Sequence, residues 1–191
     1  MSPLEPRIRP ARADEADRIE AVQRASIRRL GRPYYSPAQI DGGLNHVGTL
    51  DPQLIADGTY YVAEVDGRIV GCGGWSYRPA LHGANGAGDG TPPTTLDPAA
   101  DAARVRAIFV HPDWARRGIA RRLMRHAEAA ARRAGFRRFE LLATLSGEPL
   151  YRALGYREIE RVALELPDET RFPVVRMAKE YDPEPQVAAA A

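Results

Sequence analysis

The chain has 191 residues, of which 44% are hydrophobic and 27% are charged, and its formal net charge is +2. This apolar content excludes a chain that is disordered throughout, and the length suits one domain with a sizeable core. The balanced charge does not indicate a nucleic-acid partner. No apolar run approaches the ~20 residues that span a bilayer, so no membrane partner is expected.

The chain has one cysteine and one lysine, and each excludes further classes of protein. Cys72 is the only cysteine, which excludes an intrachain disulfide and a cysteine-based zinc cluster. Lys179 is the only lysine, so there is no GxxxxGK[ST] phosphate loop and a P-loop hydrolase is excluded. No apolar stretch typical of a secretory signal follows Met1, and we expect the protein in the cytoplasm.

Apolar spacing and turn residues predict strands and helices along the chain. In chain order we expect a strand over 7–10, a helix over 15–30 capped by Asp14, short helices starting at 36–37 and 51–52, strands over 59–65, 68–77 and 103–110, a helix over 118–134, a strand over 136–143, a short helix over 148–154, and strands over 156–166 and 172–180. A strand-helix-strand crossover then lies within an otherwise antiparallel sheet, which predicts an α/β (α+β) layered domain.

The connections between these elements differ in kind. Asp66-Gly67 predicts a two-residue hairpin turn, because Gly accepts the positive φ that such a turn requires. The segment 79–102 is rich in Gly and Pro, and we expect a long loop that is mobile or functional. We expect a single domain over 1–181, followed by a flexible tail over 182–191.

The sharpest local feature is the segment 110–123, where a strand ends, a short turn carries arginines and a glycine, and a helix begins. The first N–H groups of a helix have no internal partner, and with the helix dipole they attract anions. Gly118 would let the backbone approach a phosphate or pyrophosphate closely. An ordinary helix start with solvated arginines fits the spacing equally well. The arginines that add positive charge here are Arg116, Arg117, Arg121 and Arg122.

The segment 115–120, Ala-Arg-Arg-Gly-Ile-Ala, resembles the R/Q-x-x-G-x-G/A motif of the GCN5-related N-acetyltransferases, and the resemblance covers about residues 7–180. Ala115 departs from the first motif position, where Arg116 could substitute. The resemblance implies a mixed, mostly antiparallel sheet of six or seven strands with helices on both faces. It also implies acetyl-CoA as cosubstrate, without a metal. The residues implied at the cofactor are Phe109, Val110, Arg116, Arg117, Gly118, Ile119, Ala120, Arg121 and Ser146.

A second signature, Pro-Leu-Tyr-Arg-Ala-Leu-Gly-Tyr over 149–156, is similar to the family's F-Y-x-x-x-G-F pattern. The resemblance implies that Tyr151 protonates the departing CoA thiolate. A phenol of pKa ~10 is protonated at neutral pH, and a thiolate near ~8.5 gains from a nearby donor. A core tyrosine packed on the sheet is the alternative. Ser146 stands where many relatives have an asparagine that contacts pantetheine, which leaves that contact open.

The transfer also needs a proton acceptor, because an alkylamine of pKa ~10.4 is mostly protonated at pH 7. Glu148 is the candidate base nearest to Tyr151 in sequence, although its place at a helix start also suits a partner of the helix dipole. Glu64 and Glu165 are further candidates. The histidines lack metal-ligand spacing, so no metal site is expected.

The first helices and the neighbouring hairpin are expected to form the wall of the acceptor site. Packing in the core is the alternative for each of these side chains. The candidates are Ser26, Tyr34, Tyr35, Tyr61, Trp75 and Tyr77.

Together these features predict an N-acetyltransferase that moves an acetyl group from acetyl-CoA to a primary amine by direct attack in a ternary complex. The acceptor is expected to be a small-molecule or peptide amine, and the protein a monomer or homodimer. A non-catalytic module that binds or senses acyl-CoA is the alternative. The arginine-rich segment 116–138 could meet DNA phosphates, but its glycine-led start and alanine face suit packing on a sheet better.

Overall fold

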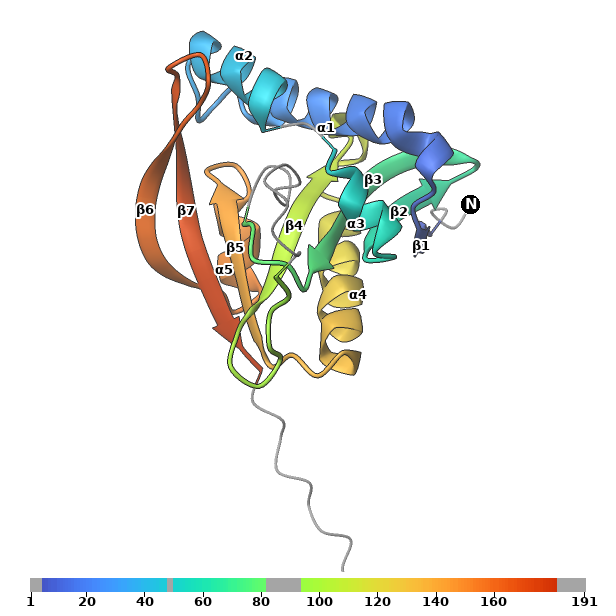
Figure 1. Cartoon of the computed structure of the whole chain (residues 1–191). Helices are drawn as coiled ribbons and strands as arrows, with labels where there is room; N and C mark the ends of the chain where they lie inside the picture. The colour runs from blue at the N-terminus through green and yellow to red at the C-terminus, as the bar shows by residue number, and fades with distance from the viewer. Residues whose placement is uncertain (1–4, 48–49, 82–93, 182–191) are drawn as a thin grey trace, which may run out of the picture.

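The computed structural model describes residues 5–47, 50–81 and 94–181. Within them, seven strands form one sheet in the order β1-β2-β3-β4-β5-β7-β6 (Figure 1). All neighbouring strands are antiparallel except β4 and β5, which are parallel. The expected mixed, mostly antiparallel sheet is therefore confirmed. The strands β1 to β7 span Arg7–Pro10, Tyr60–Val65, Arg68–Ser76, Ala103–Val110, Arg138–Thr144, Arg157–Glu165 and Arg171–Glu180.

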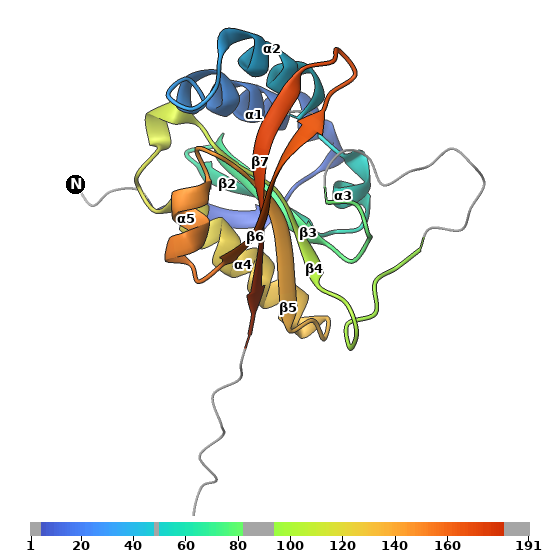
Figure 2. The same ribbon diagram turned by 90° about the vertical axis from the view of Figure 1, so that its left-hand side faces the viewer.

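Helices cover both faces of the sheet, as expected. In Figure 2, α4 and α5 lie on one side of the strands and α3 on the other, while α1 and α2 cross the top. Residues of α1 and α3 share an apolar core with β2 and β3, and α4 packs on the opposite face. None of the helices described is long and apolar enough to cross a membrane. The helices are α1 (Ala16–Leu30), α2 (Pro37–His46), α3 (Pro52–Ala56), α4 (Ile119–Arg133) and α5 (Glu148–Ala153), with 3-10 turns η1 (Ala13–Glu15) and η2 (Pro112–Trp114).

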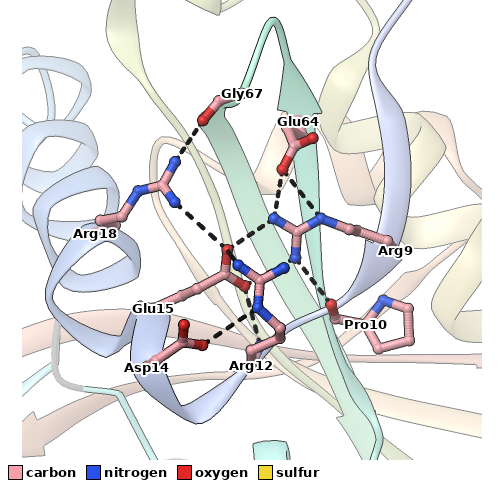
Figure 3. Close-up of polar contacts among 8 residues, drawn as sticks. All are labelled: Arg9, Pro10, Arg12, Asp14, Glu15, Arg18, Glu64 and Gly67. Carbon is pink, nitrogen blue, oxygen red and sulfur yellow. Dashed lines mark hydrogen bonds and ion pairs between the residues drawn. The ribbon is translucent and has the colours of Figure 1, made fainter.

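The start of α1 corrects one expectation. Asp14 does not cap the helix but lies in η1, and Glu15 occupies the position before α1. The Glu15 side chain is only 1% exposed, because Arg9 donates hydrogen bonds of 2.8 and 2.7 Å to it and also binds Glu64 (Figure 3). Local spacing pointed to Asp14, whereas the deciding partners lie on β1 and β2.

The hairpin between β2 and β3 turns at Asp66 and Gly67, as expected. Their φ angles of 48° and 73° place both residues in the left-handed region that a type I′ turn requires.

The segment 79–102 connects β3 to β4, and its residues 82–93 lie outside the described residues. Half of the segment expected as a mobile loop falls on them, and the expected tail over 182–191 lies outside the described residues as well. At the start of the segment, Arg78 is held by Asp57 in an ion pair of 2.7 Å. At its end, the Leu96 amide donates to the Tyr77 carbonyl at 2.7 Å.

Candidate active site

The parallel strands β4 and β5 pair over only two positions and then separate. Ala103 pairs with Phe139 and Arg104 with Glu140, after which the strands diverge toward α1 (Figure 1). Arg104 and Arg176 both bind the Glu140 carboxylate at the point of divergence. The opening continues into a cleft of about 660 Å³. The cleft is lined by residues of α1, β4, β5, the start of α4 and α5.

A bulge in β4 borders this opening. The register with β3 shifts between Cys72 and Gly74, and Ala107 has a φ of 51°, which is unusual for a residue with a side chain. The Tyr60 hydroxyl donates to the Ala107 carbonyl at 3.0 Å, and the Gln23 amide donates to the same hydroxyl at 3.0 Å. Tyr60 and Gln23 are both completely buried, so a polar chain inside the core holds the bulge.

The start of α4 faces the cleft, as the anion-site expectation requires. Gly118 is the residue before the helix and has a φ of 79°. A Cβ at this position would meet nothing within 4 Å, so space lies open beside the first helical amides. Gly118 lines the cleft together with Arg116 and Arg121. The arrangement suits a ligand that carries phosphate groups.

Most of the residues expected at the cofactor come together here. Arg117 is the exception, because its guanidinium stacks over the Trp114 ring at 4.8 Å and the residue does not line the cleft. Thr144 also lines the cleft, with its hydroxyl 3.2 Å from that of Ser146, and no sequence motif pointed to it. The expected residues that line the cleft are Phe109, Val110, Arg116, Gly118, Ile119, Ala120, Arg121 and Ser146.

Tyr151 lies on α5 and is 7% exposed. Burial raises the pKa of its phenol well above the ordinary value. Its hydroxyl has no hydrogen-bond partner among the described residues. The oxygen is also not among the fully buried side-chain atoms that lack a partner. Gly147 makes room for the ring, because a Cβ there would lie 3.0 Å from Tyr151 Cε2. The phenol is therefore protonated and open to the cleft.

A second cavity of about 90 Å³ meets the first at Tyr151. Ile108, Phe109, Thr144 and Tyr151 line both spaces. The second cavity lies against the end of α2 and the start of α3, and most of its lining is apolar. Its charged or titratable lining residues, besides Tyr151, are His46, Asp51 and Arg106.

These three residues were not among the expected site residues. Asp51 accepts a hydrogen bond from the Gln53 amide at 3.0 Å, and its other oxygen lies 3.5 Å from Arg106 Nη2. Arg106 also donates to the Ala80 carbonyl at 3.0 Å, and burial lowers the pKa of its guanidinium. Asp51 was recognised only as the start of a helix. No local motif links residues that lie so far apart in the chain.

The expected acceptor wall is divided between two parts of the molecule. Ser26, Tyr34 and Tyr35 line the cleft. The Tyr35 hydroxyl donates to the Pro173 carbonyl at 2.9 Å and accepts from the Leu145 amide at 2.8 Å. Burial raises the pKa of Tyr35 to about 12. Its hydroxyl is hydrogen-bonded on both sides and links the residue after β5 to β7.

The other three candidates for the wall do not line the cleft. Trp75 packs against Phe136, with ring centroids 5.8 Å apart, and Tyr77 packs on Trp75. Trp75 pairs with Val105, near the end of β4 where that strand is still beside β5. Tyr61 meets the His126 ring of α4.

The three carboxylates expected as bases lie outside both cavities. Glu148 binds Arg152 at 2.7 Å and Arg161 at 2.6 Å, and these partners hold its pKa below the usual range. Glu64 belongs to the Arg9 cluster, and Glu165 binds the exposed Arg171. In the described parts of the chain, no group of three or more His, Cys, Asp or Glu side chains could hold a metal ion.

The comparisons with known proteins agree with this architecture. A family model described as an acetyltransferase (GNAT) domain matches residues 56–158, more than half of the chain. No curated protein matches.

Among solved structures, a GCN5-related N-acetyltransferase from Rhodopseudomonas palustris has a TM-score of 0.71 at 20% identity, with 94% of this chain and 98% of that chain covered. The PaiA N-acetyltransferase from Thermoplasma acidophilum, in complex with coenzyme A, has a TM-score of 0.61 at 15% identity, with 92% and 99% covered. A GNAT acetyltransferase from Brucella melitensis, in complex with acetyl-CoA, has a TM-score of 0.55 at 21% identity, with 95% and 91% covered.

At these identities the solved structures share the fold, and the family match adds the sequence pattern. The parallel β4-α4-β5 unit lies within that match. The strands that separate, the glycine-led start of α4 and the tyrosine of α5 lie there too. The chain therefore belongs to the GNAT family of acetyltransferases.

Proposed function

We propose that the protein transfers the acetyl group of acetyl-CoA to a primary amine by direct attack in a ternary complex, and that residues 1–181 act as a single acetyltransferase domain. The observation that carries the proposal is the position of Tyr151. It lines both the cleft beside the start of α4 and the second cavity on the other side of the opening between β4 and β5. Two substrates that enter from opposite sides would meet at its hydroxyl.

Acetyl-CoA fits the larger cleft. The pyrophosphate would lie at the α4 start, where Gly118 leaves space and Arg116 and Arg121 supply charge. The pantetheine arm would follow the backbone of Phe109 and Val110 past Ser146. Two relatives of the same fold, from T. acidophilum and B. melitensis, were solved with coenzyme A and acetyl-CoA, which supports this cosubstrate.

Tyr151 would act as the general acid. The amine nitrogen bonds to the acetyl carbon, the carbon–sulfur bond breaks, and the sulfur accepts the phenolic proton. The proton that the acylated nitrogen then loses restores the phenol, directly or through water. Burial keeps the pKa of Tyr151 high, so the proton is present throughout the neutral range. Its partnerless hydroxyl is free to donate to a ligand without first breaking a bond within the protein.

Direct attack is favoured over an acetyl-cysteine intermediate. Cys72 is completely buried, and burial raises the pKa of its thiol to about 12. The reactive thiolate is therefore scarce at neutral pH, and the buried sulfur cannot reach a substrate.

A sensing module that binds acetyl-CoA without turnover is the second candidate. It is favoured by one observation: no carboxylate or histidine lines the larger cleft among the described residues.

Two-substrate kinetics separate these functions. Release of free thiol would be measured with a panel of small amines and peptides while both substrate concentrations are varied. Amine-dependent release with intersecting double-reciprocal lines is expected. Parallel lines would indicate a covalent intermediate. Acetyl-CoA binding without release for any amine would favour the sensor.

A further inference from the structure

The second cavity is lined by a histidine that the chemistry described so far does not use, and a carboxylate outside the cavity lining lies beside this histidine. His46 is the last residue of α2 and lines the cavity, and Asp168 lies in the turn between β6 and β7. His46 Nε2 lies 3.6 Å from Asp168 Oδ2. The Nδ1 atom of His46 has no hydrogen bond to a described residue. Nε2 of the ring therefore lies next to a carboxylate, and Nδ1 can bind a ligand.

The pair is held in place from both elements. The Thr170 amide donates to Asp168 Oδ1 at 3.1 Å, and this bond holds the pKa of Asp168 below its usual range, so the carboxylate is charged at neutral pH. Gly42 lets α2 approach the turn, because a Cβ there would lie 3.0 Å from a Leu166 methyl carbon. Gln39 adds a hydrogen bond of 3.0 Å from α2 to the backbone of β7.

The other titratable groups that line the two cavities are unsuited to accept a proton. Asp51 is bound to the Gln53 amide and beside Arg106, which is a donor only. Tyr151 is protonated, and Tyr35 is tied to two backbone groups. A neutral imidazole, by contrast, has one ring nitrogen that donates and one that accepts a proton.

We propose that His46, oriented by Asp168, is the general base that takes the proton from the acceptor amine; the inference rests on the proposed acetyl transfer. The ammonium form of the acceptor gives a proton to His46 Nδ1, directly or through a water, and the neutral amine then attacks the acetyl carbon. The cavity of about 90 Å³ has room for an amine head group and water. The His46 side chain is 27% exposed, so it returns the proton to solvent.

Charged groups near His46 can influence the pH dependence that the test measures. They come from each neighbouring element: Asp168 from the β6–β7 turn, Asp51 before α3, Arg106 from β4, and Arg24 of α1, which donates to the Leu44 carbonyl at 2.7 Å. Variants at His46 and Asp168 leave the other three in place.

The pH dependence of kcat/KM for the amine tests the proposal. The wild type is expected to lose activity on the acid side as one group becomes protonated. His46→Gln is expected to lower kcat/KM by ~10²-fold and to abolish that acid limb, with the acetyl-CoA Kd unchanged. His46→Ala is expected to recover part of the rate when imidazole is added. Asp168→Asn, which leaves the imidazole present, is expected to cause a smaller loss.

The control is His126→Gln, which lies on α4 across the sheet and packs on Tyr61. It is expected to keep the wild-type rate and acid limb. A wild-type profile in His46→Gln, with acetyl transfer intact, would overturn the base assignment and leave the proposed function standing. The assignment would also be overturned if kcat/KM fell together with Tm in both His46→Gln and Asp168→Asn, and imidazole did not rescue His46→Ala. The pair would then only stabilise the fold. A wild type inactive with every amine would overturn both proposals.

Discussion

The proposed acid role of Tyr151 depends on one atom, its phenolic oxygen. Tyr151→Phe keeps the ring and removes a hydroxyl that has no partner in the described parts of the chain. We expect kcat to fall by ~10²-fold, while Tm does not fall, because removal of a hydroxyl without a protein partner costs little. The acetyl-CoA Kd should stay unchanged. Tyr181→Phe, at the exposed residue that follows β7, is the matched control.

A Tyr151→Phe protein with near-normal turnover would remove the phenol from the mechanism and leave water as the donor. A large drop in Tm with a modest loss of kcat would mean that Tyr151 is a packing residue only.

Two substitutions of Gly118 separate the effect of a negative charge on acetyl-CoA binding from the effect of backbone strain on stability. Its φ of 79° disfavours any side chain, so both Gly118→Ala and Gly118→Glu should lower Tm by a similar amount, through about 1 kcal/mol of strain. Only Glu places a negative charge beside the proposed position of the pyrophosphate. We expect the rise in Tm on adding acetyl-CoA to persist in the Ala variant and to vanish in the Glu variant. Equal shifts in both would place the pyrophosphate elsewhere.

At the scale of single residues, the site residues that belong to local motifs could be predicted from the sequence. The glycine-led turn at Gly118 and the tyrosine of α5 are local patterns, and both residues line the cleft. Glu148 was a reasonable base by proximity, but its position is decided by Arg161, thirteen residues away on a different strand. His46 and Asp168 lie too far apart in the chain for any spacing rule to pair them.

Among the elements, the bulge in β4 shapes the site because it changes the direction of the backbone beside the opening. Tyr60→Phe would free the Ala107 carbonyl and remove the partner of the Gln23 amide. We expect the free energy of unfolding to fall by ~1–3 kcal/mol, because buried polar groups lose their bonds. We also expect kcat to fall more than acetyl-CoA affinity. Urea denaturation, the acetyl-CoA Kd and steady-state kinetics measure these effects.

Tyr61→Phe is the matched control, since Tyr61 is the adjacent residue of β2 and packs on the α4 side without a hydrogen bond from its hydroxyl to any described residue. A Tyr60→Phe protein that is as stable and active as the Tyr61→Phe protein would show that the buried chain does not hold the bulge.

Most elements could be predicted from periodicity and turn residues, and their ends differ from the expected ones by at most two residues where they differ. The strand β4 (Ala103–Val110) has the bounds expected from its apolar run. The bulge within it could not be foreseen, because it depends on Tyr60 from another strand. The separation of β4 from β5 likewise follows from pairing between strands, which no single segment encodes.

Over the whole molecule, the ion cluster at the N-terminal side predicts how stability depends on pH. The hydrogen bonds from Arg9 lower the pKa of Glu15 to about 2 (Figure 3). The ordinary value in an unfolded chain is ~4.3, so the stabilisation is complete above pH ~5 and is lost as the pH falls toward ~2. Glu15→Gln should therefore lower the free energy of unfolding at pH 7 by about 3 kcal/mol and flatten its decline in acid. Thermal melts from pH 7 to pH 2 measure this.

Asp14→Asn is the matched control, because Asp14 is the exposed neighbour of Glu15 in η1. It should leave both the stability and its decline in acid close to wild type. If the two variants melt alike at every pH, the cluster contributes nothing and its burial is incidental.

The central claim is that acetyl moves from acetyl-CoA to an amine on this protein. Acetyl-CoA labelled in the acetyl group would be incubated with the protein and the best amine, and mass spectrometry would measure labelled acetyl-amine and free CoA together. We expect equal amounts of the two products, formed only when protein and amine are both present. Free CoA without labelled amine, or no consumption of acetyl-CoA with any amine, would contradict the account.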